Sequence, residues 1–119
     1  MIRLLNDRRI VAAKLPRNTT EMTVSGITGW RYSITSQLKD RYKMFTYFDG
    51  SLYQVMVIDP DVAGRYGIHD THLFGDGKIC LNQERGYPTL EQAFAKSVLW
   101  ANGFSIFLKT NIFPFSNNN

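Results

Sequence analysis

Cysteine is almost absent from the 119-residue sequence, because Cys80 is the only one. No disulfide can form within the chain, which favours a reducing compartment, and we expect a cytoplasmic protein. Long apolar runs are also missing. The longest, residues 97–108, is interrupted by Asn102, Gly103 and Ser105. It is shorter than the roughly 20 residues that cross a bilayer, so neither a transmembrane helix nor a membrane partner is predicted.

Low-complexity stretches are missing as well, apart from the asparagines that end the chain. With 44% hydrophobic and 13% aromatic residues, the composition predicts a folded core rather than disorder. We expect a single domain over residues 1–119, with a variable N-terminal segment at 1–27 and a disordered tail at 117–119. The first nine residues become charged too quickly for a secretory signal, so none is expected.

Charge is distributed unevenly along the chain. Residues 1–43 contain nine Lys or Arg against three acids, a balance of +6, whereas residues 44–119 contain five against seven, a balance of −2. The basic part is either ordinary solvated surface or a docking surface for an acidic partner. Aromatic and basic residues do not alternate densely enough to predict a nucleic-acid surface, so a nucleic-acid partner is not expected.

The hydrophobic pattern changes along the chain and indicates an α+β fold. Helical spacing from residue 2 to residue 15, closed by Pro16, predicts a short amphipathic helix. Runs rich in aromatic and β-branched residues predict three strands of an antiparallel meander, at residues 30–34, 42–48 and 53–58. Residues 59–88 hold five glycines, both histidines and the cysteine, which predicts a long functional loop packed on the core.

A C-terminal helix is expected after Pro88. Thr89 can cap it and Gln92, three residues later, can complete a capping box. Matching apolar periods predict that the helix packs on the sheet, with a break possible at residues 102–103. The residues expected in this interface are Tyr32, Ile34, Met44, Val55 and Val57 from the strands and Phe94, Val98, Ala101 and Leu108 from the helix.

The chemistry-bearing residues gather in one segment, residues 69–81. Its string Gly77-Lys78-Ile79-Cys80-Leu81 resembles the cysteine end of the motif of ubiquitin-conjugating enzymes, which is His-Pro-Asn, five residues, then Gly-x-Ile/Leu-Cys-Leu. His72 stands eight residues before the cysteine, with four residues instead of five before Gly77, and we align it with the family's asparagine across this shorter loop. A histidine there is similar to the prokaryotic branch of the family, including members encoded beside cyclic-oligonucleotide antiphage systems.

The resemblance implies a fold, an activity and partners. The fold would be that of ubiquitin-conjugating (UBC) enzymes: a meander, a long active-site loop and a helix on the sheet. Cys80 would accept the C-terminus of a ubiquitin-like protein as a thioester and transfer it to an amine. The implied partners are that modifier, an activating enzyme and, in the antiphage setting, a cyclic-nucleotide synthase. No cofactor and no metal are implied.

The histidine and its neighbours would support the cysteine. His72 would donate to the oxyanion of the tetrahedral intermediate or act as a base for the incoming amine. His69, Asp70, Asp76 and Gly77 are expected to shape the loop, and the two aspartates can do so by accepting hydrogen bonds from its backbone. The mechanism predicts that the sulfur is at least partly accessible and shares a shallow groove with His72.

Three other interpretations remain open at this point. The chain could be a catalytically inert UBC-like module that binds a partner through the same surface. It could be a cysteine hydrolase with His69 or His72 as base, although no orienting acid is evident. It could hold a metal through His69, His72, Cys80 and an aspartate, although the repeated ligand pairs of common metal sites are missing.

Overall fold

The computed structural model describes residues 2–62, 64, 71–73, 76–81 and 85–115. It is an elongated body with principal extents of 43 × 27 × 27 Å. Helix α1 (Ile2–Lys14) is followed by strands β1 (Thr20–Val24), β2 (Ile27–Thr35), β3 (Arg41–Phe48) and β4 (Tyr53–Asp59), and then by helix α3 (Leu90–Thr110). The α+β class predicted from the sequence is confirmed.

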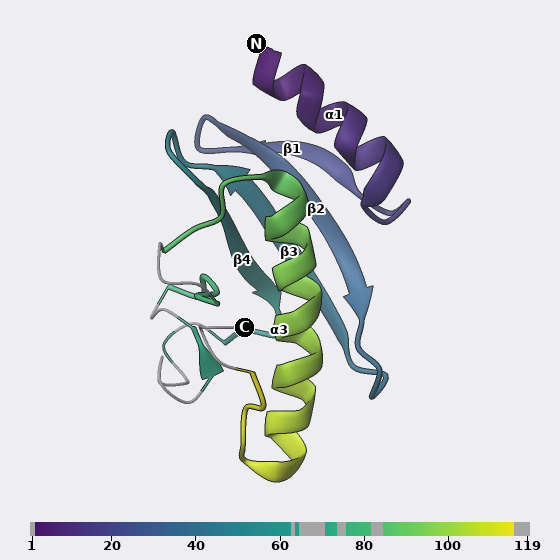
Figure 1. Ribbon diagram of the computed structural model, residues 1–119, viewed down its shortest axis with the longest axis vertical. Coiled ribbons are helices and arrows are strands. Elements are labelled where there is room, and N and C mark those ends of the chain that lie inside the picture. The colour runs from purple at the N-terminus through teal and green to yellow at the C-terminus, as the bar shows by residue number, and fades with distance from the viewer. Residues whose placement is uncertain (1, 63, 65–70, 74–75, 82–84, 116–119) are drawn as a thin grey trace.

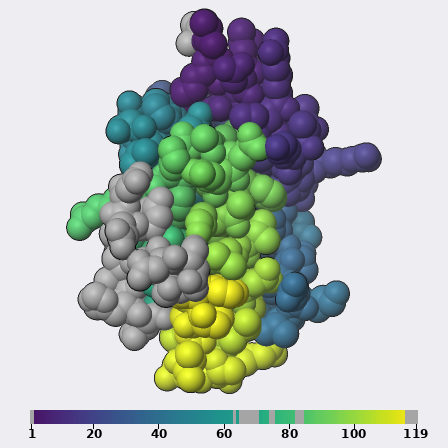
Figure 2. Space-filling model, in the orientation of Figure 1, coloured from purple at the N-terminus to yellow at the C-terminus, as the bar shows by residue number. Residues whose placement is uncertain are grey.

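The four strands form one antiparallel sheet in the order β1-β2-β3-β4. Helix α3 lies along one face of the sheet, and α1 lies across one end (Figure 1). In the space-filling view α1 (purple) forms one end of this face of the molecule, and the last turns of α3 with the residues just after them (yellow) form the other (Figure 2). None of the described helices is long and apolar enough to cross a membrane.

Strand β1 was not predicted, since we assigned residues 1–27 to a variable segment. It pairs with β2 through a two-residue turn at Ser25 and Gly26, which have φ angles of 51° and 80°. Positive φ at both turn residues is the geometry that suits the twist of a tight hairpin. Every residue of β1 except Met22 is exposed, so its side chains carry little of the alternating apolar pattern that marks a strand.

Between α3 and the sheet lies the core, largely as predicted. Tyr32, Met44, Val55 and Val57 are buried on the sheet side, while Ile34 is half-buried. The buried face of α3 consists of Leu90, Ala93, Ser97, Trp100, Ala101, Gly103, Phe104 and Ser105. The Trp100 and Phe104 rings stack with centroids 4.7 Å apart, and both meet the edge of Tyr42.

Two expectations for α3 are wrong. Leu108 is 53% exposed, because the last turns of the helix extend past the strands (Figure 1). The helix is also continuous through Asn102 and Gly103. The Asn102 side chain accepts a hydrogen bond from the Gln37 amide at 2.8 Å, so this residue anchors the helix instead of ending it. Phe94 and Val98 are half-buried, and the predicted cap is confirmed, since Thr89 Oγ1 accepts from the Gln92 amide at 3.1 Å.

Hydroxyl groups fix the position of α3 on the sheet. The Tyr32 hydroxyl donates to Ser97 Oγ at 2.7 Å and lies 3.0 Å from Thr46 Oγ1. The Tyr42 hydroxyl lies 2.7 Å from Ser105 Oγ. Burial raises the pKa of Tyr32 to about 12, and the hydrogen bonds of its hydroxyl with Ser97 and Thr46 oppose this shift. These buried polar atoms are directional, so they specify one alignment of helix and sheet.

Phe104 and Leu108 provide a matched test of this packing. Phe104→Ala empties a fully buried site and should lower the free energy of unfolding by about 3–5 kcal/mol. Leu108→Ala removes an exposed side chain and should change it by less than about 0.5 kcal/mol. Urea unfolding of both variants measures the difference, and equal losses would contradict the packing described.

The buried Tyr32 phenol predicts a loss of stability at alkaline pH. Because its pKa is higher in the folded protein than the ordinary value of 10, its contribution is constant below pH 10 and declines as the pH rises toward about 12. The urea midpoint should therefore fall above pH 10, and fall less in Tyr32→Phe. A wild-type midpoint that is flat between pH 9 and 11.5 would contradict this.

Candidate active site around Cys80

The described parts of the loop after β4 pair with the outer edge of that strand. The Val57 amide donates to Gly77 O at 3.0 Å, and the Ile79 amide donates to Val55 O at 2.9 Å. Further along, Tyr53 and Tyr87 exchange both backbone hydrogen bonds, at 2.8 and 2.9 Å. The cysteine segment is therefore attached to the sheet immediately before and several residues after Cys80.

Asp76 and Gly77 form the turn that brings the chain to this edge. The Lys78 amide donates to Asp76 Oδ1 at 3.1 Å, and the Lys78 ammonium lies 3.3 Å from Asp76 Oδ2. Gly77 has φ of 91°, a conformation that side chains rarely adopt. Both residues take part in this turn, and their support of the chemistry at Cys80 stays a prediction. His69 and Asp70, which were given the same role, lie outside the described residues.

His72 and Cys80 are brought together through the backbone. The Cys80 amide donates to His72 O at 2.8 Å, and Leu73 and Ile79 form a bridge beside this bond. His72 has φ of 55°, in the left-handed region. Its ring lies 5.0 Å from the ring of Phe113, centroid to centroid. A backbone hydrogen bond thus joins His72 and Cys80, while a groove shared by the His72 ring and the sulfur stays a prediction.

Cys80 is more enclosed than the mechanism led us to expect. Only 7% of the residue is exposed, so the prediction of a partly accessible sulfur is wrong for this conformation. Its neighbours Ile79 and Leu81 are core residues at 1% and 0% exposure. Because the apolar residues on both sides of the cysteine join the core, they draw the segment between them inward.

Two side chains hold this segment that the sequence did not single out for the task. Trp100 of α3 donates from Nε1 to Thr71 O at 2.8 Å, next to His72. The Tyr87 hydroxyl accepts from the Leu81 amide at 3.1 Å. No local pattern could have revealed either contact, since the partners are 29 and 6 residues apart and meet only in the folded loop.

The pKa of Tyr87 depends in part on the charge of Cys80. Burial raises the pKa of Tyr87 to about 12, the hydrogen bond from the Leu81 amide opposes this, and negative charge on Cys80 raises it further. The phenol is therefore neutral at physiological pH and lies in the electrostatic range of a Cys80 thiolate. A neutral buried hydroxyl that accepts from the Leu81 amide can stabilise the loop without adding a charge beside Cys80.

The geometry bears on the alternative chemistries. Within the described residues no carboxylate accepts from the His72 ring, so none of them orients His72 as the base of a cysteine hydrolase, and His69 lies outside the described residues. In the same part of the chain, no group of three His, Cys, Asp or Glu side chains is placed to hold a metal ion. Neither alternative gains support from the structure.

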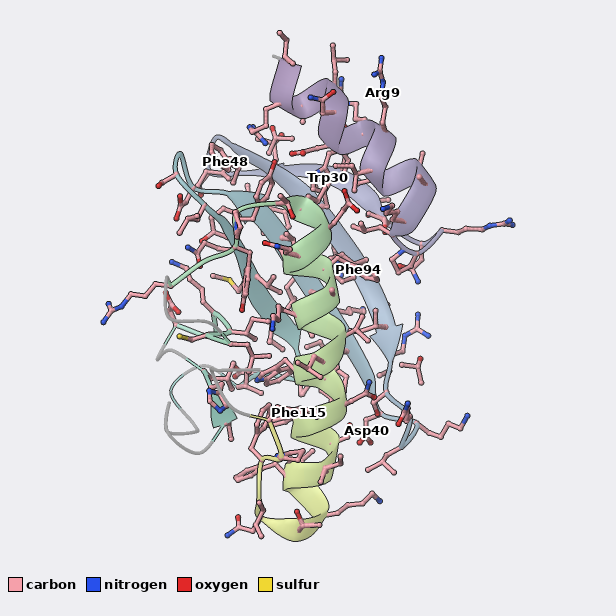
Figure 3. All side chains as sticks on the ribbon, in the orientation of Figure 1. Arg9, Trp30, Asp40, Phe48, Phe94 and Phe115 are labelled. Carbon is pink, nitrogen blue, oxygen red and sulfur yellow. The ribbon has the colours of Figure 1, made fainter. Side chains whose placement is uncertain are left out.

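The basic N-terminal segment is largely engaged within the chain. Arg8 donates twice to Glu21 of β1, at 2.8 and 2.9 Å, and Lys14 pairs with Glu91 of α3. Arg3 pairs with the buried Asp7 at 2.9 Å. Arg9 points away from the body of the protein (Figure 3). Arg8 and Lys14 therefore pair with residues outside α1, whereas the Arg3–Asp7 pair lies within the helix.

Comparisons with protein-family models, with curated proteins and with solved structures found no match to this chain.

The Tyr87 hydroxyl gives a test of the site's architecture. Tyr87→Phe keeps the ring but leaves the buried Leu81 amide without its acceptor, which should lower the free energy of unfolding by about 1–3 kcal/mol. Urea unfolding measures the loss. Hydrogen exchange should accelerate at the Leu81 amide in particular, and a loss below about 0.5 kcal/mol with unchanged exchange would show that this bond does not anchor the loop.

Proposed function

We propose that this protein carries an acyl group on Cys80, accepting the C-terminus of a ubiquitin-like protein as a thioester and passing it to an amine. The observation that supports the proposal is the position of the cysteine. It lies in a segment attached to the outer edge of β4, and its amide is hydrogen-bonded to the His72 carbonyl. The helix that follows this segment in the chain packs on the sheet. The Gly-x-Ile-Cys-Leu string occupies this position.

The transfer would proceed by two substitutions at one carbonyl carbon. The Cys80 thiolate attacks the carbonyl of the modifier's thioester on an activating enzyme, a new C–S bond forms, and the enzyme's own thiolate leaves. An amine nitrogen then attacks the Cys80 thioester, an amide forms, and the amine loses a proton while Cys80 leaves as a thiolate. Thiolates suit both steps because they attack and depart well.

His72 is the residue proposed to assist the second step. Its carbonyl already holds the Cys80 amide, so a movement of the histidine is transmitted to the cysteine. In the present conformation its ring packs on Phe113. A reaction with two large proteins in turn requires the enclosed sulfur to become accessible, so the proposal includes an opening of the loop during the cycle.

An inert UBC-like interaction module is the second candidate, and the enclosure of Cys80 favours it. A cysteine at 7% exposure between two core residues is what a purely structural cysteine would show. Such a module would bind its partner without forming a covalent bond. The two candidates differ in one measurable property, the reactivity of the thiol in the native protein.

The decisive experiment combines the protein with an activating enzyme, ATP and a ubiquitin-like modifier from the same genome. Wild type should form an adduct that thiols cleave, Cys80→Ser a thiol-resistant ester, and Cys80→Ala none. His72→Ala should form the adduct but discharge it to an amine more slowly, by a factor on the order of 10²–10³ if the histidine stabilises the oxyanion. Intact-mass spectrometry with and without dithiothreitol reads all four proteins.

Leu108→Ala is the matched control for these variants, because it alters an exposed residue on the far turn of α3 and should behave as wild type. An adduct that persists in Cys80→Ala would remove the cysteine from the mechanism. A wild-type protein that forms no adduct and whose native thiol resists alkylation would favour the inert module.

A further inference from the structure

The chain turns back on itself after α3. Asn111 caps the helix in the left-handed conformation, with φ of 63°, and its amide donates to Phe107 O at 2.7 Å. Thr110 Oγ1 accepts from the Ile112 amide at 3.2 Å, which tightens the turn. Residues 112–115, called the C-terminal strap below, then run back beside the helix (Figure 1).

A glycine of α3 provides the seat for this strap. A Cβ atom at Gly103 would lie 2.6 Å from Phe113 Cζ and 2.8 Å from Phe115 Cδ2. Real Cβ contacts are longer, so only glycine lets both rings reach the helix this closely. The two rings also meet edge to face, with centroids 6.0 Å apart. Phe115 can be seen turned toward the helix in Figure 3.

The strap also contacts the cysteine loop. The Phe113 ring packs on the His72 ring, and the His72 carbonyl accepts the Cys80 amide. The His72 backbone lies in the left-handed region, which non-glycine residues adopt uncommonly. A continuous chain of contacts therefore runs from Gly103 through Phe113 and His72 to Cys80.

The interactions of the strap with the other described residues are few. Among the described residues, 113–115 make no backbone hydrogen bond, and Ile112 is 69% exposed. Within the part of the chain that the structure describes, the turn at Asn111 and two half-buried aromatic rings fasten the segment. Segments with few buried contacts and exposed backbones open locally at a small fraction of the cost of global unfolding.

We propose that the C-terminal strap is a latch on the Cys80 loop. Seated on Gly103, it holds His72 in place and keeps the cysteine enclosed. When it lifts, the restraint on His72 is lost, the hydrogen bond from the Cys80 amide breaks, and the thiol becomes accessible. The latch concerns the cysteine of the proposed function, yet it needs no modifier or activating enzyme, so the two can fail separately.

Hydrogen exchange tests the latch at the bond that it controls. Phe113→Ala should accelerate exchange of the Cys80 amide, which bonds to His72 O, by about tenfold or more. The Ile79 amide is the internal control, because it bonds to Val55 O of β4 and should keep its protection. In parallel, iodoacetamide should alkylate Cys80 of the native Phe113→Ala protein about tenfold faster than that of wild type.

Gly103→Ala is the second variant, and it keeps both phenylalanines. Its new Cβ would displace the rings, while alanine favours the helix itself, so the latch should open without loss of α3. Leu108→Ala, outside the strap, should match wild type in both assays. The latch is refuted if exchange of the Cys80 amide or alkylation of the Cys80 thiol is unchanged in Phe113→Ala and Gly103→Ala. It is also refuted if the Ile79 and Cys80 amides lose protection equally.

Discussion

The buried contact between α3 and the sheet is the constraint on which the rest of the structure depends. Hydroxyl pairs join Tyr32 to Ser97 and Tyr42 to Ser105, and the stacked Trp100 and Phe104 rings fill the space between them. Apolar packing alone tolerates small shifts of a helix, whereas directional hydrogen bonds in a dry core do not. The helix is therefore held at one angle and one height on the strands.

Helix α3 positions the cysteine loop through contacts at two of its residues. Trp100 reaches through the core to the Thr71 carbonyl, and Gly103, one turn on, seats the aromatic rings that touch His72. The edge of β4 holds the other half of the loop through Val55 and Val57. Cys80 thus lies between a rigid attachment to the sheet and a more easily detached one to the chain terminus. In the proposed mechanism, the enclosed thiol would react only when its loop opens, and the strap would be the restraint that is released.

A structural role and a chemical role for Cys80 make different demands on its surroundings. A purely structural cysteine needs only apolar neighbours, which Ile79 and Leu81 supply. A reactive one also needs groups that steady its loop and tolerate its charge, and Tyr87 and His72 stand where such groups would act. The neutral Tyr87 phenol serves either role. The two roles therefore differ in whether the loop opens, which the proposed latch would control through the contact of Phe113 with His72.

The sequence by itself determined the elements whose signals are local: the helix before Pro16, the three aromatic strands and the helix capped by Thr89. Their periods reflect burial on one face, which neighbouring residues encode together. The exposed strand β1 lacked that pattern. Gly103 suggested a break in the helix, because the rings of Phe113 and Phe115, which require a glycine at this position, come from a segment outside the helix. Only the tertiary structure decided the enclosure of Cys80 and the contacts of His72, Tyr87 and Trp100. These contacts join separate segments, and the distances between the segments depend on how the helix, the sheet edge and the strap pack together.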